Sequence, residues 1–280
     1  MERTSLLHAI LAIIDNNNYQ ICGAKSGNLS QNGKGLEEFI IRAFSNSFLM
    51  DDEEYTRRLH EVYSYLGSAH SPPDAMIRGG AAIEIKKIGA GSQYIQFNSS
   101  MPKHVLRSTD PMLTEECRNA EVWDRKSMIY AIGIVNEDIL RHLFFVYGVD
   151  YCALNSCERV TRTLKTSIRK ITDLVFEDTN ELGRINNIDP YGNTYLRMRG
   201  MWVMKTPWKV FGITPDNSKS FTMTIIVNDR IWSAEKELSG IDEDLLVQKG
   251  LSIENYSIKN PDDSQVLVPG KLISYSISND

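Results

Sequence analysis

Hydrophobic and polar residues alternate along residues 82–88, and this is the clearest pattern in the chain. Strict alternation is typical of a β-strand with one buried face. Ile83 and Ile85 would then point to one side of the strand, and Glu84 and Lys86 to the other. The pattern therefore predicts a strand that carries a carboxylate and an ammonium group on the same face.

A second, shorter strand is predicted immediately before this one, over residues 74–77. Between the two strands, Arg78-Gly79-Gly80 supplies the glycines that a tight turn needs. Together these segments predict a hairpin. Its two strands would bring Asp74 close to Glu84.

Longer apolar periodicities predict the other elements. Helical spacing predicts helices over residues 5–15, 36–48, 53–66, 111–126 and 156–171. Strands are predicted over residues 94–97, 128–135, 140–152, 195–202 and 221–228, with weaker alternation over 266–276. The 111–126 helix would start with Asp110 as its N-cap and Pro111 as its first residue. Polar composition predicts loops over 16–35 and 98–107, and no linker divides the chain, so we expect one α/β domain over residues 1–280.

Composition places the chain among ordinary globular proteins. Its 280 residues are 42% hydrophobic and 24% charged, and no apolar run approaches the ~20 residues of a membrane-spanning helix. The N-terminal segment does not resemble a signal peptide. The four cysteines show no zinc-binding spacing, so we expect reduced thiols in a cytoplasmic protein that is not associated with a membrane.

The charges are unevenly distributed along a chain whose net charge is −5. Residues 159–170 and 197–209 each carry several basic side chains and no acidic ones. Acidic residues concentrate elsewhere, as at 51–54 and 242–244. A basic cleft on an acidic body is therefore expected, and such a cleft suits a nucleic acid.

The predicted hairpin carries the pattern P-D-x9-E-x-K, in which Asp74, Glu84 and Lys86 would meet. Mg²⁺ prefers oxygen ligands and usually takes one or two carboxylates, with waters and substrate phosphates completing its shell. Asp74, Glu84 and the carbonyl of Ile85 are the candidate ligands for a metal that activates water against a phosphodiester. Lys86 would orient the water, or act as its base if its pKa is lowered. The alternative is an amphipathic hairpin with a charged solvent-facing side.

Glu37 and Glu38 lie on the helix predicted before the hairpin. A glutamate in this position can reach a metal cluster from the side. The alternative is that both carboxylates simply stabilise the positive N-terminal end of the helix dipole.

Two further groups of polar residues are candidates for DNA contacts. Hydroxyl, amide and ammonium groups that follow the hairpin suit phosphates or base edges: Asn98, Ser99, Ser100 and Lys103. Arg197 and Arg199 alternate on a predicted strand and would face the same way, and each can read a guanine through O6 and N7. The alternatives are a solvated loop and a charged exposed face.

Several blocks of sequence resemble the NgoPII family of type II restriction endonucleases. They retain their order along the chain and lie at residues 64–67, 71–76, 82–87, 98–103, 146–152, 188–190 and 195–202. The resemblance extends from about residue 30 to residue 210 and is vaguer beyond.

The resemblance implies a PD-(D/E)xK nuclease fold, with a mixed sheet of about five strands flanked by helices. It implies a Mg²⁺-dependent enzyme that cuts both strands of an unmethylated DNA palindrome, GGCC or a related site, as a homodimer with a cognate DNA methyltransferase in the same system. Asp74, Glu84 and Lys86 would be the catalytic trio, and Glu37 would match the auxiliary helix acid. The catalytic core would span about 30–180, and 181–280 would supply recognition strands and a C-terminal elaboration.

Two other functions remain open on the residues alone. One is a repair or recombination nuclease with the same fold, which would cut at DNA structures rather than at a sequence. The other is a DNA-binding protein with a vestigial metal site, although the intact trio argues against this reading.

Overall fold

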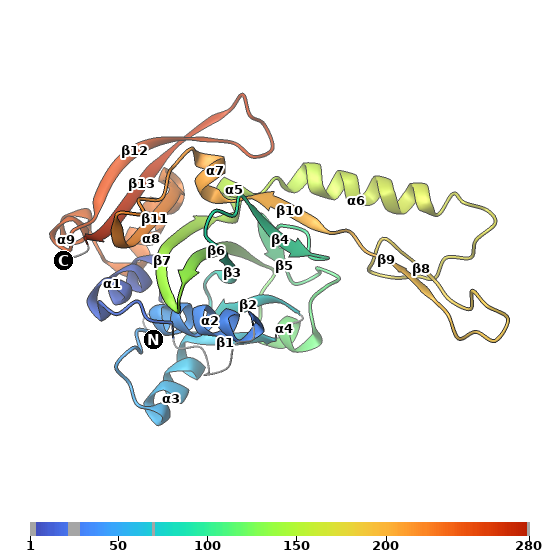
Figure 1. The fold of residues 1–280 in the computed structure, drawn as a ribbon, viewed down its shortest axis with the longest axis horizontal. Helices are drawn as coiled ribbons and strands as arrows, with labels where there is room; N and C mark the ends of the chain where they lie inside the picture. The colour runs from blue at the N-terminus through green and yellow to red at the C-terminus, as the bar shows by residue number, and fades with distance from the viewer. Residues whose placement is uncertain (1–3, 22–28, 69–70, 279–280) are drawn as a thin grey trace.

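A computed structural model describes residues 4–21, 29–68 and 71–278 of the chain. Its centre is a nine-stranded mixed sheet, in which eight strands follow the order β1-β2-β3-β6-β7-β11-β13-β12 and β5 pairs with β6 (Figure 1). These strands are β1 (Tyr63–Ser68), β2 (Ser71–Ile77), β3 (Ala82–Ile88), β5 (Val105–Arg107), β6 (Arg125–Asn136), β7 (Ile139–Tyr147), β11 (Lys219–Asn228), β12 (Ser252–Lys259) and β13 (Leu267–Ser278). The α/β class is as predicted, but the expected number of about five strands is wrong.

Most neighbouring strands of the sheet are antiparallel. The pairs β3–β6 and β7–β11 are parallel and join segments that are distant in the sequence. The central strand β6 is buried from Met128 to Val135, as its run of apolar residues requires when both faces of a sheet are covered.

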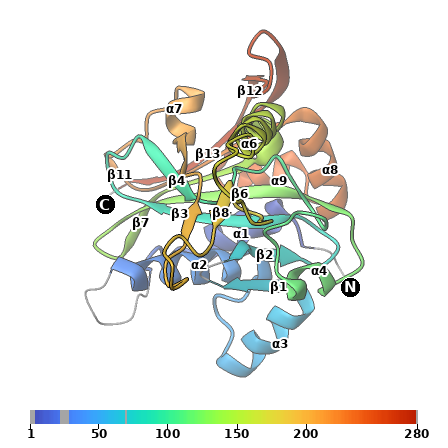
Figure 2. The same ribbon diagram turned by 90° about the vertical axis from the view of Figure 1, so that its right-hand side faces the viewer.

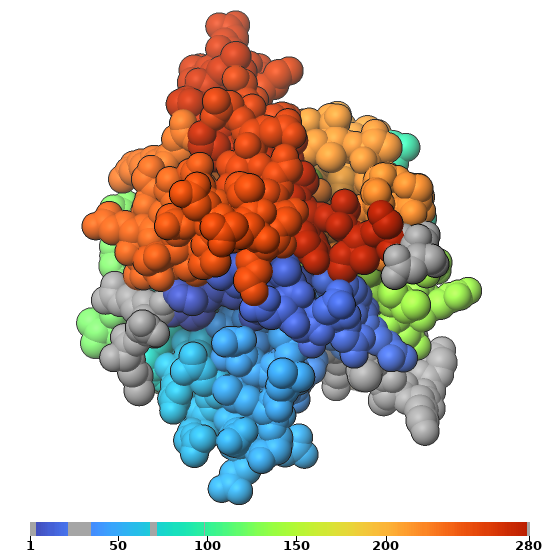
Figure 3. All heavy atoms as spheres, turned by 90° about the vertical axis from the view of Figure 1, so that its left-hand side faces the viewer, coloured from blue at the N-terminus to red at the C-terminus, as the bar shows by residue number. Residues whose placement is uncertain are grey.

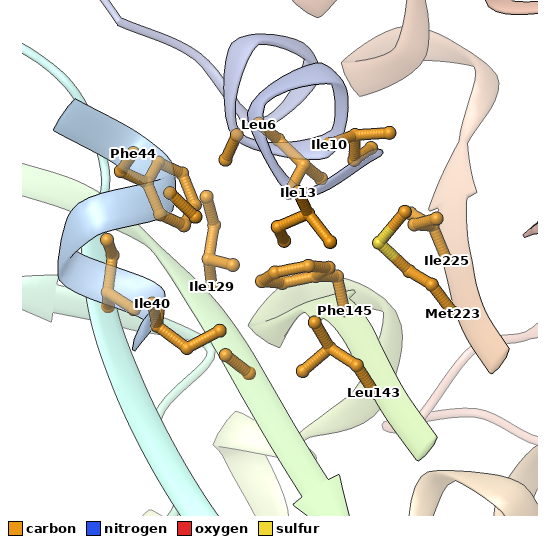
Figure 4. Close-up of a cluster of buried hydrophobic side chains, with 14 of the residues drawn as sticks. Leu6, Ile10, Ile13, Ile40, Phe44, Ile129, Leu143, Phe145, Met223 and Ile225 are labelled. Carbon is orange, nitrogen blue, oxygen red and sulfur yellow. The ribbon is translucent and has the colours of Figure 1, made fainter. Parts of the chain in front are cut away.

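Three helices cover one face of the sheet: α1 (Leu6–Asn16), α2 (Leu29–Ser45) and α8 (Asp229–Ser239). Helix α1 starts where the Ser5 hydroxyl accepts a hydrogen bond from the backbone N–H of His8. Apolar residues of α1 and α2 pack with side chains of β6, β7 and β11 (Figure 4). This contact forms one hydrophobic core, in which Phe44 and Phe145 meet edge to face with ring centroids 6.1 Å apart.

The N-terminal and C-terminal segments lie side by side on the face shown in Figure 3. Glu235 of α8 accepts hydrogen bonds from the backbone N–H of Leu6, at 2.8 Å, and from the Tyr147 hydroxyl, at 2.5 Å. Burial raises the pKa of Glu235. This buried carboxyl group ties α8 to α1 and β7. The remaining helices here are α3 (Asp52–Val62) and α9 (Glu243–Gln248).

The other face of the sheet is covered by shorter elements around a second apolar core. They are β4 (Tyr94–Asn98), α4 (Glu115–Asn119), α5 (Gly148–Tyr151), β10 (Trp202–Lys205) and α7 (Pro207–Phe211). Strands β4 and β10 pair with each other as an antiparallel ribbon. Tyr130 lies at the centre of this core, between Phe97 and Tyr151.

Residues 154–205 project from this body as an arm (Figures 1 and 2). The arm consists of α6 (Leu154–Ile168), a hairpin of β8 (Gly183–Ile185) and β9 (Leu196–Met198), and the returning strand β10. No residue of α6 is buried. Helix α6 therefore adds no buried side chain to the core.

Several predicted boundaries are wrong. The helix expected over 111–126 is only α4, capped by Thr114, because the Asp110 carboxylate is already engaged by Lys103 and by the Arg107 N–H. The helix predicted to reach residue 66 ends at Val62, and strand β1 begins at the next residue. Helix α2 begins at Leu29, inside the predicted loop, and the strand predicted over 195–202 divides into β9 and β10. Within the described residues, no helix has the length and apolar character to cross a membrane.

Candidate active site

The predicted hairpin is present as strands β2 and β3. They pair through Ala75 with Ile83 and Met76 with Ala82, and the pairing stops there. Beyond that point the Asp74 side chain replaces the backbone pairing. Its Oδ2 accepts a hydrogen bond of 2.6 Å from the backbone N–H of Ile85. The side chain of Asp74 is thereby fixed against the edge of β3, beside the predicted metal ligands.

Glu84 and Lys86 lie on the same face of β3, as strict alternation requires. The Lys86 Nζ is 2.6 Å from Glu84 Oε1, and it lies over the ring of Phe97 at 5.8 Å from the ring centroid. Glu84 is 7% exposed, whereas Lys86 is partly accessible to solvent. The structure therefore brings Asp74, Glu84 and Lys86 together at one place.

The electrostatics of this cluster are those of crowded carboxylates. Burial and the neighbouring Glu84 carboxylate raise the pKa of Asp74 to about 7. Burial alone would lower the pKa of Lys86, but the carboxylates of Glu84 and Asp74 outweigh it and raise that pKa. Lys86 is therefore a cation in this arrangement, which does not favour a role as a neutral base.

The Glu37 side chain of α2 is exposed and lies close enough to act on the same cluster. Its charge contributes to raising the pKa of both Asp74 and Lys86. Glu38, in contrast, forms an ion pair with Arg42 at 2.8 Å on the same helix. Of the two glutamates, Glu37 is thus the one whose charge raises the pKa of Asp74 and Lys86.

The donor set suits a hard divalent cation that keeps much of its own hydration. Two adjacent carboxylates with mutual repulsion favour a cation between them. Within the described part of the chain, no three His, Cys, Asp or Glu side chains are grouped as a metal site. The protein would thus supply two carboxylates, a number that Mg²⁺ commonly takes when water and phosphate complete its shell.

Tyr130, a buried residue of β6 that sequence reasoning missed, anchors the loop that follows β4. The Tyr130 hydroxyl accepts a hydrogen bond from the Lys103 N–H, at 2.7 Å, and donates one to the Lys103 carbonyl, at 2.9 Å. Tyr130 is also the register partner of Glu84 across the parallel β3–β6 pair. One signal pointed to it: Tyr130 carries a polar atom inside an otherwise apolar strand.

The loop that carries the predicted DNA-contacting residues follows Phe97, whose ring centroid lies 5.8 Å from the Lys86 Nζ, but Lys103 is already paired. Its ammonium lies 3.1 Å from Asp110 Oδ2, and both side chains are largely buried. Ser99 and Ser100 are partly exposed. The side chain of Asn98 lies outside the described part of the structure.

Arg197 and Arg199 lie on the arm, and one carboxylate holds both. Glu181 accepts hydrogen bonds from Arg197 through Nε, at 3.0 Å, and Nη2, and another from Arg199 Nε. The Glu181 side chain is 11% exposed, while those of the two arginines are about 43% and 45% exposed. Sequence reasoning missed Glu181, because no pattern in the residues around it indicates that it pairs with Arg197 and Arg199.

The arm and strand β3 are linked through elements on the second face of the sheet. Strand β10, which returns from the arm, pairs with β4 from Trp202 opposite Asn98 to Lys205 opposite Tyr94. The loop after β4 is the one that Tyr130 holds. A continuous path of hydrogen-bonded elements therefore runs from the arm to the neighbour of Glu84.

A cavity of about 750 Å³ in the described part of the chain lies elsewhere. It is lined by residues from the β3–β4 loop and from the starts of β7 and β11, including Arg141, His142 and Lys219. None of the trio lines it.

A mixed sheet with two carboxylates and a lysine on adjoining strands defines a candidate phosphodiester hydrolase. The family model described as NgoPII restriction endonuclease matches residues 4–259, and the chain therefore belongs to that family. A curated relative, the type II restriction enzyme NgoPII of Neisseria gonorrhoeae, is 40% identical over 281 residues, which cover 97% of this chain and 100% of the relative. No solved structure matches the chain.

Proposed function

We propose that this protein is a Mg²⁺-dependent type II restriction endonuclease that cuts both strands of DNA at a short palindrome, GGCC or a related site. The observation that carries the proposal is the convergence of Asp74, Glu84 and Lys86 on adjoining strands. The family membership supports the nuclease class and the DNA substrate, and it favours sequence-directed cutting over a repair role.

In the proposed mechanism, Asp74 and Glu84 would hold the metal ion, with the carbonyl of Ile85 as a further ligand. The backbone N–H of Ile85 fixes Asp74, so one ligand is oriented before the substrate arrives. When bound, the metal ion lowers the pKa of a water molecule and neutralises charge on the scissile phosphate.

Lys86 keeps its proton and places a positive charge beside the attacked phosphate. In this role it orients the attacking water and offsets the negative charge that develops in the transition state. Glu37 approaches from α2 and would contribute as an auxiliary acid. These roles define the PD-(D/E)xK type of active site.

DNA is proposed to lie across the face that carries the arm. Asn98, Ser99, Ser100 and Lys103 would contact phosphates or base edges next to the trio, and Arg197 and Arg199 would read guanines. Lys103 would have to exchange Asp110 for a phosphate. A homodimer would present one trio to each strand, since a palindrome repeats its half-site about a two-fold axis. A cognate DNA methyltransferase would protect the host genome.

The test is digestion of unmethylated phage DNA by the purified protein, with Mg²⁺ and with EDTA. Discrete fragments that require Mg²⁺, with ends that map to one palindrome, are the expected result. A smear would indicate a nonspecific or structure-directed nuclease. Absence of cutting under all conditions would refute the proposed activity.

Point variants test the site itself. Asp74→Ala and Glu84→Ala should abolish cleavage while DNA binding in EDTA survives, because loss of a metal ligand removes chemistry but leaves phosphate contacts. Glu237→Ala, which removes an exposed carboxylate of α8, is the matched control. Cleavage at the parental rate by either site variant would refute the assignment.

A further inference from the structure

The cavity of about 750 Å³ lies on the same face of the sheet as the candidate active site. Ile134 of β6 lines it, and Ile134 is the register partner of Ile88 across the parallel β3–β6 pair. Paired residues of neighbouring strands point to one face, and so do alternate residues of a strand, so Ile88 and Ile134 share the face of Lys86. Since a strand rises about 3.3 Å per residue, the Cα of Ile88 lies only about 7 Å beyond that of Lys86.

The charges around this cavity are one-sided. The described residues that line it include three basic side chains, those of Arg141, Lys209 and Lys219, and no acidic one. All three bind neutral groups. Arg141 donates to a backbone carbonyl at 3.4 Å, Lys219 to a serine hydroxyl at 3.1 Å, and Lys209 to an amide oxygen. Their positive charges are therefore available to an anion.

One carboxylate stands near these cations, that of Asp216, and it is already engaged. Its Oδ1 accepts hydrogen bonds from the Ser218 N–H, at 2.9 Å, and from the Ser218 hydroxyl, at 2.6 Å. The hydrogen bonds from Ser218 hold the pKa of Asp216 below its usual value, and its charge also acts on Lys219. Three cations and one carboxylate leave the cavity with a net positive charge, which favours an anionic ligand.

The remaining lining residues combine apolar surface with neutral polar groups. Apolar surface comes from Ile134, Trp208 and Ile213, and amide groups come from Gln93, Asn136 and Asn217. Amides both donate and accept hydrogen bonds, which suits the edges of a nucleobase, whereas apolar surface suits the faces of its ring. The volume lies within the range of small-molecule sites, and a phosphate ion alone would leave most of it unfilled.

One wall of the cavity is held in place by a buried histidine. His142 is 4% exposed. Its Nδ1 lies 2.7 Å from the Thr222 Oγ1, and its Nε2 lies 3.1 Å from the Asn217 Oδ1. These contacts join β7 to β11 and to the loop before β11, so the position of Asn217 is set without a ligand. A wall that is already ordered reduces the entropy that a ligand loses on binding.

We propose that this cavity binds a nucleotide, with the phosphate at Arg141, Lys209 and Lys219 and the base against the apolar wall. A guanidinium group can hold a phosphate through two parallel hydrogen bonds, and the ammonium groups add point charges. Free nucleotides and a DNA strand that runs along this face from the candidate active site are two sources of the same chemistry. Binding needs no cleavage of a phosphodiester, so the inference goes beyond the proposed function.

The first experiment is isothermal titration calorimetry of the full-length protein with deoxyguanosine 5′-monophosphate in EDTA. We expect one nucleotide to bind per chain. Deoxyguanosine and inorganic phosphate should each bind at least tenfold more weakly, because each engages only one part of the cavity. Undetectable binding of the nucleotide at millimolar concentration, or binding of phosphate as tight as that of the nucleotide, would overturn the proposal.

Two variants assign the binding to the cavity. Lys209→Gln/Lys219→Gln removes two cations from exposed and partly exposed positions, and it should weaken nucleotide binding at least tenfold. Thr214→Trp fills the cavity from an exposed lining position, and it should weaken binding as much without changing any charge. Lys259→Gln removes an exposed cation that does not line the cavity and is the control. Parental affinity in either cavity variant would refute the assigned site.

A short DNA duplex, added in EDTA, distinguishes the two sources of nucleotide. If a DNA strand enters the cavity, the duplex displaces the nucleotide and binds the double variant more weakly than the Lys259 control. If the nucleotide stays bound and the duplex binds both variants equally, the cavity takes free nucleotides. Cleavage with Mg²⁺ is measured separately: an enzyme that cuts but binds no nucleotide refutes only this inference, and a protein that binds nucleotide but never cuts refutes only the proposed function.

Discussion

Replacing Asp74 with asparagine should stabilise the metal-free protein while removing its activity. In EDTA, no metal ion offsets the charge of Asp74. Burial and the neighbouring Glu84 carboxylate then raise the pKa of Asp74 from 3.8 to about 7. A rise of that size corresponds to about 4 kcal/mol of unfavourable interaction once the carboxylate is ionised. Asparagine keeps an oxygen that can accept the Ile85 N–H, and it carries no charge.

The sign of the pH dependence follows from the direction of this shift. Because the folded protein holds the Asp74 proton more tightly than the unfolded chain does, the parent loses stability as pH rises from about 4 to about 7. The asparagine variant lacks this loss. Allowing for relaxation and water penetration, we expect it to be more stable than the parent by about 1–3 kcal/mol at pH 8, and by much less at pH 4.

Urea unfolding in EDTA at both pH values measures this difference, and Asp124→Asn, at an exposed carboxylate, is the control. Added Mg²⁺ should then stabilise the parent but not the Asp74 variant, since binding to the folded state alone raises its stability. An asparagine variant that is no more stable than the parent at pH 8 in EDTA would refute the inference that burial and the Glu84 carboxylate make ionised Asp74 unfavourable in the folded protein.

Four other substitutions probe the arm and the loop after β4. Replacing Arg197 or Arg199 with alanine should weaken binding to the cognate site by about 1–3 kcal/mol in fluorescence anisotropy, and an equal loss on random DNA would instead indicate a phosphate contact. Glu181→Gln should reduce the preference for the cognate site over a site with one changed base by about tenfold, because it loosens both guanidinium groups; an unchanged ratio would mean that Glu181 does not position them. Tyr130→Phe should destabilise the protein by about 2–4 kcal/mol in urea unfolding, because it leaves the N–H and carbonyl of Lys103 unpaired, and Tyr191→Phe, at an exposed ring, should show no comparable loss.

The hairpin of β2 and β3 could be predicted because its signals are local. Alternation over residues 82–88 and glycines at the turn determine the strands and the faces of Glu84 and Lys86 without reference to the rest of the chain. Helix α6 was predicted for the same reason. A predicted strand at residues 221–228 likewise agrees with β11.

The features that could not be predicted depend on distant partners. Asp110 has the local signature of an N-cap, but Lys103 engages its side chain, so no helix starts there. The extra strands of the sheet, including β12, form through pairings that only the assembled C-terminal region provides. Glu181 shows the same limit in the candidate site, because its partners lie 16 and 18 residues further along the chain.

The arm occupies the connection between the parallel neighbours β7 and β11. The entropy of closing such a connection grows only with the logarithm of its length, at about 0.6 kcal/mol for each doubling. Insertions, deletions and substitutions in the arm therefore disturb the pairing of β7 with β11 very little. Under the proposed assignment of Arg197 and Arg199 to guanine reading, the DNA sequence that is read could therefore change through substitutions in the arm, while the strand that bears Glu84 and Lys86 is left unaltered.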